Sequence, residues 1–135
     1  MALICDTGPL VAAADRSDPH HERCAALIAD TQERLVVPFC VLVEVEYHLR
    51  PWAGAFENLL ADFDRGALEL LDVPTRWLLR AGQLLSRYRD LKLGLVDATV
   101  LAATEMLGEP KVATLDHRHF SVVRPAHVEA LTLLP

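Results

Sequence analysis

Short apolar segments alternate with helical patterns along this chain, and the alternation restricts the folds that it can adopt. The apolar segments lie at 2–5, 35–37, 68–73, 112–115 and near 129–133. Helices are predicted between them at about 10–15, 19–31, 41–49, 53–65, 75–91 and 97–107. Short buried strands separated by helices are typical of a parallel sheet that is covered on both faces. We therefore predict one α/β domain over residues 1–135, with a central parallel sheet of four to five strands.

Residues that commonly begin or end helices flank several of these patterns. Asp18 is predicted to cap the second helix, with Pro19 at its first helical position. Asp97 is predicted to open the last long helix. Pro51 and Gly66 follow helical patterns and are expected to end them. Each of these helices therefore has a start or a stop that is visible in the sequence.

The composition excludes several classes of protein. A chain of 135 residues with 52% hydrophobic residues can bury a core, which excludes disorder as its main state. Its 13 Lys and Arg residues against 19 Asp and Glu give a net charge of −6, which argues against a polybasic nucleic-acid binder. The same charge is compatible with a nucleic-acid enzyme whose acidic residues hold a metal ion.

The cysteines and the apolar runs bear on the cellular compartment. Cys5, Cys24 and Cys40 lie among apolar residues and lack zinc-ligand spacing, as expected of free thiols in a reducing cytoplasm. The longest apolar run, 36–43, is too short to span a bilayer. The N-terminal segment has no basic residues and Asp6 interrupts it, so it does not fit a secretory signal. We therefore expect a soluble cytoplasmic protein without membrane contact.

Four carboxylates adjoin the apolar segments. Asp6 and Asp116 each follow a predicted strand directly, Asp97 begins a helix, and Glu44 lies inside an apolar run. Each has an ordinary structural alternative, since Asp97 can be only a helix cap and Asp116 only a turn residue. In a parallel sheet, however, the carboxyl ends of neighbouring strands meet at one edge, where ligands bind. Asp6 and Asp116 are therefore expected to meet if their strands are neighbours.

A cluster of carboxylates at that edge would call for a cation. Two carboxylates about 4 Å apart repel each other by roughly 4 kcal/mol at an effective dielectric constant of 20. A site built from oxygen ligands suits Mg²⁺ or Mn²⁺. Such an ion activates water and stabilises the charge that develops in a phosphoryl displacement. The cluster therefore predicts metal-dependent chemistry on a phosphate ester.

The residues around these carboxylates form four motifs. They are Ile4-Cys5-Asp6-Thr7, Val41-Leu42-Val43-Glu44-Val45, Val96-Asp97-Ala98, and Thr114-Leu115-Asp116 with Phe120 four residues on. In this order the motifs span nearly the whole chain and resemble those of the PIN-domain ribonucleases, most closely the VapC-type toxins of toxin–antitoxin operons. The resemblance implies a three-layer α/β/α sandwich and an endoribonuclease that depends on Mg²⁺ or Mn²⁺. It also implies a homodimer that is inhibited by a small VapB-type antitoxin.

Carried over by position, the resemblance also assigns the site residues. It gives metal binding and catalysis to Asp6, Glu44, Asp97 and Asp116, with Thr7 and Thr114 in support. Two positions depart from the family pattern: Gly8 stands where many relatives have Ser, Thr or Asn, and His119 where some carry another acid. The missing acid leaves the number of metal ions open. His119 can be a phosphate contact, a proton carrier or only an exposed residue of a turn.

Basic residues gather in one segment of this acidic chain. Residues 76–96 carry a net charge of +4, which leaves −10 for the rest of the chain. On a helical wheel Arg76, Arg80 and Arg87 fall within about 40° of one another and so form a basic stripe. Such a stripe is either a solvated surface or a track for an RNA backbone. Arg118 and His119 are further candidates for phosphate contacts.

Apolar residues in the 53–65 helix suggest a partner surface. Phe56, Leu59, Leu60 and Phe63 recur at positions i, i+3, i+4 and i+7. The spacing fits a helix that simply packs on the core. It also fits a dimer contact or a groove for the antitoxin, and the sequence does not separate these alternatives.

Two rival functions follow from the same residues. Asp6-Thr7-Gly8 is also the signature tripeptide of aspartic proteases, but those proteins are nearly all β, whereas this chain has long helical periods. The second rival is a catalytically weak module of the same fold that acts through its partner or dimer surface. The presence of all four carboxylates counts against this second possibility.

Overall fold

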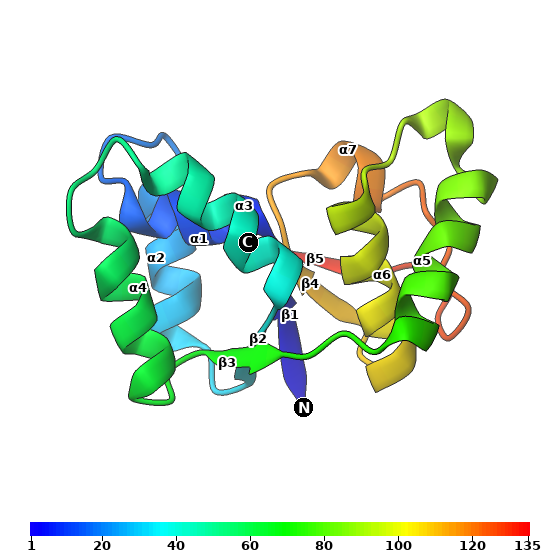
Figure 1. The fold of residues 1–135 in the computed structure, drawn as a ribbon, viewed down its shortest axis with the longest axis horizontal. Helices are drawn as coiled ribbons and strands as arrows, with labels where there is room; N and C mark the ends of the chain where they lie inside the picture. Colours follow the sequence, from blue (N-terminus) through cyan, green and yellow to red (C-terminus); the bar gives the residue numbers. More distant parts are fainter.

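Five strands form one parallel sheet in the computed structural model, which describes residues 1–135 (Figure 1). The strands are β1 (Ala2–Cys5), β2 (Arg34–Pro38), β3 (Glu69–Leu71), β4 (Lys111–Ala113) and β5 (Thr132–Leu134). The helices are α1 (Thr7–Ala14), α2 (His21–Asp30), α3 (Phe39–Leu49), α4 (Ala55–Asp64), α5 (Thr75–Arg87), α6 (Leu95–Leu107) and α7 (His117–Phe120), with a 3-10 turn η1 (Arg89–Leu91) between α5 and α6. The predicted parallel sheet of four to five strands is therefore confirmed.

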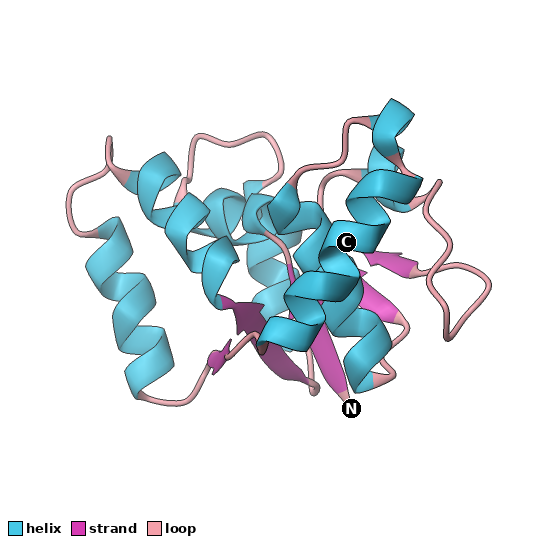
Figure 2. Ribbon diagram, turned by 45° about the vertical axis from the view of Figure 1, so that its right-hand side comes forward, coloured by secondary structure: helices cyan, strands magenta, loops and turns pink.

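The helices cover both faces of the sheet. The chain passes from β1 through α1 and α2 to β2, and from β2 through α3 and α4 to β3. Right-handed crossovers place these four helices on one face, and the return from β3 to β4 places α5 and α6 on the other. Figure 1 shows the two groups on opposite sides of the strands, and Figure 2 shows the strands running among them. The three-layer α/β/α sandwich is confirmed, and this architecture excludes the aspartic protease alternative.

The order of the strands places β1 at the centre of the sheet, as β3-β2-β1-β4-β5. From β1 the chain moves outward to β2 and β3, and it then returns to the other side of β1 to form β4. The carboxyl ends of β1 and β4 therefore flank a topological switch point, which is where open α/β sheets bind ligands. Ile4 is in register with Val112 and Cys5 with Ala113, so the residues that follow both strands meet at this edge.

Helix α6 is the most deeply buried helix. Every residue from Ala98 to Thr104 is buried, because α6 lies between the sheet and α5. A helix that is apolar on all sides fits such a position. With 13 residues α6 is one of the two longest helices, and none of the helices has the length and apolar character needed to cross a bilayer.

Several predicted boundaries were wrong. The helix expected from 19 begins at His21, because the Asp18 carboxylate accepts a hydrogen bond from the backbone N–H of His20 at 2.8 Å and so closes a turn. The helix expected over 75–91 ends at Arg87 and continues as η1. Helix α6 begins at Leu95, so Asp97 is its third residue and not its cap. Helix α7 was not predicted, since its four residues are too few for a periodic pattern.

Candidate active site

Asp6 lies at the centre of the site, between the end of β1 and the start of α1. Its backbone N–H donates to the carbonyl of Ala113 at 2.9 Å, which fixes it beside β4. The hydroxyl of Thr114 donates to Asp6 Oδ2 at 2.8 Å. The side chain is only 6% exposed, and burial raises the pKa of Asp6 to about 6, against the hydrogen bonds from Thr7 and Thr114. Burying a carboxylate in its charged form is unfavourable for folding, and such carboxylates are typical of functional sites.

Glu44 reaches the same region from α3. The hydroxyl of Thr7 donates to Glu44 Oε1 at 2.7 Å, and the negative charge of Glu44 adds to the raised pKa of Asp6. Thr7 follows Asp6 directly, so the hydrogen bond fastens α3 to the start of α1. Two threonines therefore each orient one carboxylate, Thr114 for Asp6 and Thr7 for Glu44.

Asp97 enters from the first turn of α6. Its Oδ2 accepts a hydrogen bond from the backbone N–H of Gly94 at 3.0 Å, so the residue also stabilises the helix start. Burial raises the pKa of Asp97, and the negative charges of Asp116 and Glu44 raise it further. As the third residue of α6, Asp97 therefore makes the capping-box hydrogen bond to the backbone N–H of Gly94 and also lies within electrostatic reach of the other carboxylates.

Asp116 lies on the other side of Asp6 and caps α7. Its Oδ1 accepts a hydrogen bond from the backbone N–H of His119 at 3.0 Å, and its Oδ2 lies 2.6 Å from His119 Nδ1. The Asp116 N–H donates to the hydroxyl of Thr114 at 3.0 Å, and that hydroxyl donates to Asp6. His119, Asp116, Thr114 and Asp6 therefore form one hydrogen-bonded series.

The four carboxylates interact electrostatically but do not converge on one point. Asp97 and Glu44 both raise the pKa of Asp6, and Asp116 raises that of Asp97. No three His, Cys, Asp or Glu side chains are close enough together to hold an ion directly. The carboxylates can thus influence one another's pKa without being close enough to bind one ion together. Electrostatic effects act over several Å, whereas a bond from oxygen to Mg²⁺ is only about 2.0–2.1 Å long. Since Mg²⁺ keeps several of its waters, this oxygen-only donor set fits it through direct and water-mediated contacts.

The structure separates the three arginines of the predicted stripe. Arg80 donates to both carboxylate oxygens of Glu105, at 2.7 and 2.9 Å, and so holds α5 against α6. Glu105 lies near the end of α6, about 12 Å along the helix from Asp97, and Arg76 lies beyond Arg80 in the same direction. Only Arg87 lies at the end of α5 that leads to the site. Arg80 thus pairs with Glu105 and holds α5 against α6, at the end of these helices away from Asp97.

Other predicted phosphate contacts lie beside the carboxylates. Arg118 is exposed on α7 and has no ion-pair partner, while His119 is bound to Asp116. Arg89 and Lys92, on the turn that leads to Asp97, were not singled out from the sequence. Their charges were visible in the +4 segment, but their place beside the site was not.

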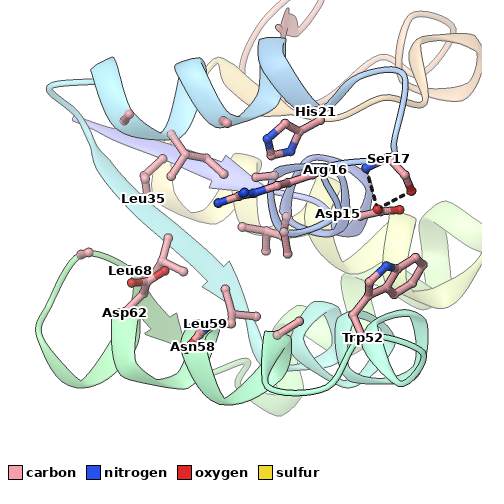
Figure 3. A pocket seen from close by; sticks show the side chains of 18 of the residues that line it. Asp15, Arg16, Ser17, His21, Leu35, Trp52, Asn58, Leu59, Asp62 and Leu68 are labelled. Atoms are coloured by element: carbon pink, nitrogen blue, oxygen red, sulfur yellow. Dashed lines mark hydrogen bonds between the residues drawn. The ribbon is translucent and has the colours of Figure 1, made fainter.

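A cavity lies away from the carboxylates, between α1, α2 and α4 (Figure 3). It has a volume of about 950 Å³, and none of the four carboxylates lines it. Leu59 of the predicted apolar stripe faces this groove, whereas Leu60 is 43% exposed. Phe56 and Phe63 are half-buried and pack against the core, so the stripe contributes both to the core and to the groove.

The comparisons with known proteins agree with this geometry. The family model described as "PIN domain" matches residues 3–124. Ribonuclease VapC26 from Mycobacterium tuberculosis is 29% identical to this chain over 135 residues, which cover 98% of this chain and 100% of the relative. The match therefore includes every element that contributes a residue to the site.

Solved structures share the fold over the same length. VapC20 from Mycobacterium tuberculosis, a sarcin–ricin loop cleaving toxin, has a TM-score of 0.81 at 21% identity and covers 94% of this chain and 98% of its own. VapBC2 from Rickettsia felis, bound to a promoter DNA fragment, has a TM-score of 0.69 at 17% identity, with 100% of each chain covered. A toxin–antitoxin complex from Klebsiella pneumoniae has a TM-score of 0.70 at 14% identity, with 96% and 99% covered. The chain belongs to the PIN domain family, and within that family it is similar to VapC proteins.

Proposed function

We propose that this protein is an Mg²⁺- or Mn²⁺-dependent endoribonuclease and the toxin of a toxin–antitoxin pair. The observation that carries the proposal is the buried carboxylate of Asp6 at the switch point of the sheet, with a raised pKa and three further carboxylates around it. The relative named a ribonuclease matches this chain over nearly its full length, and the related toxin shares its fold, which supports the proposal. Burial of like charges is unfavourable for folding, so it indicates a function that needs them.

The residues have distinct roles in this proposal. Asp6, Glu44, Asp97 and Asp116 would hold the ion, directly or through water. When bound, the ion supplies an activated water and neutralises charge on the phosphodiester. Thr114 and Thr7 fix the orientation of Asp6 and Glu44, and each leaves one oxygen of its carboxylate without a side-chain partner. The expected products carry a 3′ hydroxyl and a 5′ phosphate.

A purified sample tests the activity. Cellular RNA is incubated with the protein and Mn²⁺ or Mg²⁺, and the new 5′ ends are sequenced. We expect discrete cuts that Asp6→Asn and Asp97→Asn abolish, while Asp64→Asn, which removes an exposed carboxylate on α4, behaves as the wild type. Calorimetry with Mn²⁺ alone is expected to detect binding to the wild type and not to Asp6→Asn. An absence of cleavage with either ion would refute the proposal.

The binding-module alternative makes a different prediction. A module that acts only through its surface would inhibit growth equally well as the wild type and as folded Asp97→Asn. An enzyme would lose growth inhibition with that change. Expression of both forms, with circular dichroism as the check on folding, therefore separates the two functions.

We propose that the antitoxin binds the groove between α1, α2 and α4 (Figure 3). The groove is lined mainly by apolar side chains, with Arg16, Asp15 and Asp62 among the polar ones. An apolar groove of about 950 Å³ with charged residues among its lining suits an amphipathic helix. The related complexes from Rickettsia felis and Klebsiella pneumoniae are toxin–antitoxin assemblies, which supports a partner of this kind.

We propose further that two copies associate through α3. Phe39, Val43 and Tyr47 follow one another at intervals of four residues and are 55%, 56% and 63% exposed. Beside them lies a hollow of about 510 Å³ that Phe39 shares with Leu78 of α5. An exposed apolar stripe next to a hollow is suited to a symmetric contact, in which each copy fills the hollow of the other.

A further inference from the structure

The basic side chains of this protein divide into those with an ion-pair partner and those without. Five of the 13 are paired with carboxylates, namely Arg34, Arg50, Arg65, Arg80 and Lys111. Paired guanidinium and ammonium groups have their charge neutralised locally and contribute little to a distant anion. The remaining eight basic residues therefore determine where the protein attracts a polyanion.

Three of those eight lie within six residues of one another, on the turn from α5 to α6. Arg87, Arg89 and Lys92 are all exposed, and none of them has a carboxylate partner. Arg118 is exposed in the same way on α7, which follows the end of β4. These four residues are called the basic rim below.

The turn that carries most of the basic rim is fastened beside the carboxylates. At one end the Gly94 N–H donates to Asp97. At the other end the hydroxyl of Tyr88 accepts a hydrogen bond at 2.7 Å from the backbone N–H of Arg124, just beyond α7. Figure 1 shows α7 and the top of the α5–α6 hairpin at the same edge of the molecule. The rim is thus held close to Asp97 and Asp116.

The backbone conformation of Lys92 also supports a functional role for this residue. Its φ of 56° is in the left-handed region, and it is the one residue other than glycine with a positive φ. This conformation costs a side-chain-bearing residue roughly 1–2 kcal/mol. Glycine would fit the turn without that cost, so the lysine side chain is more consistent with a function than with the needs of the turn.

We infer that the basic rim binds the phosphate backbone of a single-stranded RNA and holds it across the carboxylates. The inference rests on the proposed ribonuclease function and names the surface that receives the substrate. An acidic peptide is the less suitable partner, because it has no phosphodiester bond for the neighbouring carboxylate site to cleave. The groove suited to a protein helix lies elsewhere, between α1, α2 and α4.

The salt dependence of RNA binding tests this inference. All proteins carry Asp6→Asn to prevent cleavage, and binding of a fluorescent single-stranded 20-nucleotide RNA is followed by anisotropy from low to high KCl. We compare Arg87→Gln/Arg89→Gln/Lys92→Gln with the charge-matched control Arg23→Gln/Arg34→Gln/Arg76→Gln, whose three arginines are also exposed and belong neither to the rim nor to the groove. Each lost phosphate contact lowers the slope of log K against log salt by about 0.7 for single strands, so the rim variant is expected to lose about 2.

The outcomes are distinct. The rim variant is expected to bind RNA roughly tenfold more weakly than the wild type at low salt. In proteins that keep Asp6, the rim substitutions are expected to raise KM with little change in kcat. The control is expected to keep the salt slope and the RNA affinity of the wild type. Equal losses in both variants would show a general charge effect and overturn the inference. Unchanged RNA binding with weaker antitoxin binding would assign the rim to the protein partner and also overturn it. If the protein binds RNA through the rim but the wild type cuts no RNA with Mn²⁺ or Mg²⁺, the proposed ribonuclease function is refuted while the inference about the rim stands.

Discussion

Removing the charge of Asp6 is expected to stabilise the folded protein. Burial, together with the charges of Asp97 and Glu44, raises the pKa of Asp6 from 3.8 to about 6. A difference of about two pKa units corresponds to about 3 kcal/mol at 1.36 kcal/mol per unit. Asp6→Asn keeps an oxygen that can accept the hydrogen bond from Thr114 but has no charge to bury. The variant is therefore expected to be up to about 3 kcal/mol more stable than the wild type at pH 7.5.

The pH dependence of this difference has a definite sign. Since the pKa of Asp6 is higher in the folded protein than in the unfolded chain, protonation favours folding. That contribution is complete below about pH 4 and is lost as the pH rises to about 6. The wild type therefore loses stability relative to Asp6→Asn over this interval, and above it the difference stays constant.

Urea unfolding followed by circular dichroism measures this difference. The experiment uses EDTA throughout, at several pH values between 4 and 8, with the exposed Asp64→Asn as a control that is expected to change little. In a second series without EDTA, Mn²⁺ is expected to stabilise the wild type and not Asp6→Asn. An Asp6→Asn protein that is no more stable than the wild type at pH 7.5, or a difference that does not vary with pH, would refute the reasoning.

Three further predictions concern packing, positioning and assembly. Arg80→Ala leaves Glu105, whose side chain is 7% exposed, without its partner. The variant is expected to lose about 2 kcal/mol or more of unfolding free energy in urea and to keep the RNA affinity of the wild type. Weaker RNA binding at full stability would contradict this prediction. His119→Ala is expected to lower kcat more than it raises KM because Asp116 loses a donor, and His119→Asn to restore part of kcat; equal activities of the two variants would exclude the hydrogen bond as the cause. Val43→Lys is expected to yield monomers in sedimentation equilibrium, and an unchanged dimer would place the contact elsewhere.

The strands and most of the candidate site could be predicted from the sequence because each depends on local signals. Residues 2–5 form an uninterrupted apolar run, and such a run is typical of the central strand of a parallel sheet. Asp6 and Asp116 come after strands, and the ends of parallel strands share one edge. The order of the strands depends on long-range pairing and is not visible locally. The prediction that these two aspartates meet was therefore conditional until the pairing of β1 with β4 was known.

The arrangement of the arginines could not be predicted for a related reason. A helical wheel gives the angle of a residue around the helix axis but not which end of the helix lies beside the site. It also says nothing of a partner on another helix, and Glu105 lies 25 residues after Arg80. Arg89 and Lys92 were not singled out as candidate phosphate contacts, because they fall outside the regular helix, where a helical wheel does not apply.

The net charge of −6 is a poor guide to the partner of this protein, because local pairing decides which charges act at a distance. Ion pairs neutralise Arg34, Arg50, Arg65, Arg80 and Lys111, together with one carboxylate each, and so leave the net charge unchanged. The charges that remain unpaired include carboxylates at the end of β1 and the basic rim beside them. A polyanion can approach such a surface only where the rim lies, and it can cross the carboxylates only when a cation neutralises them. RNA binding and divalent ion binding are therefore expected to reinforce each other, so RNA affinity should rise when Mg²⁺ is added to the wild type and stay unchanged in Asp6→Asn.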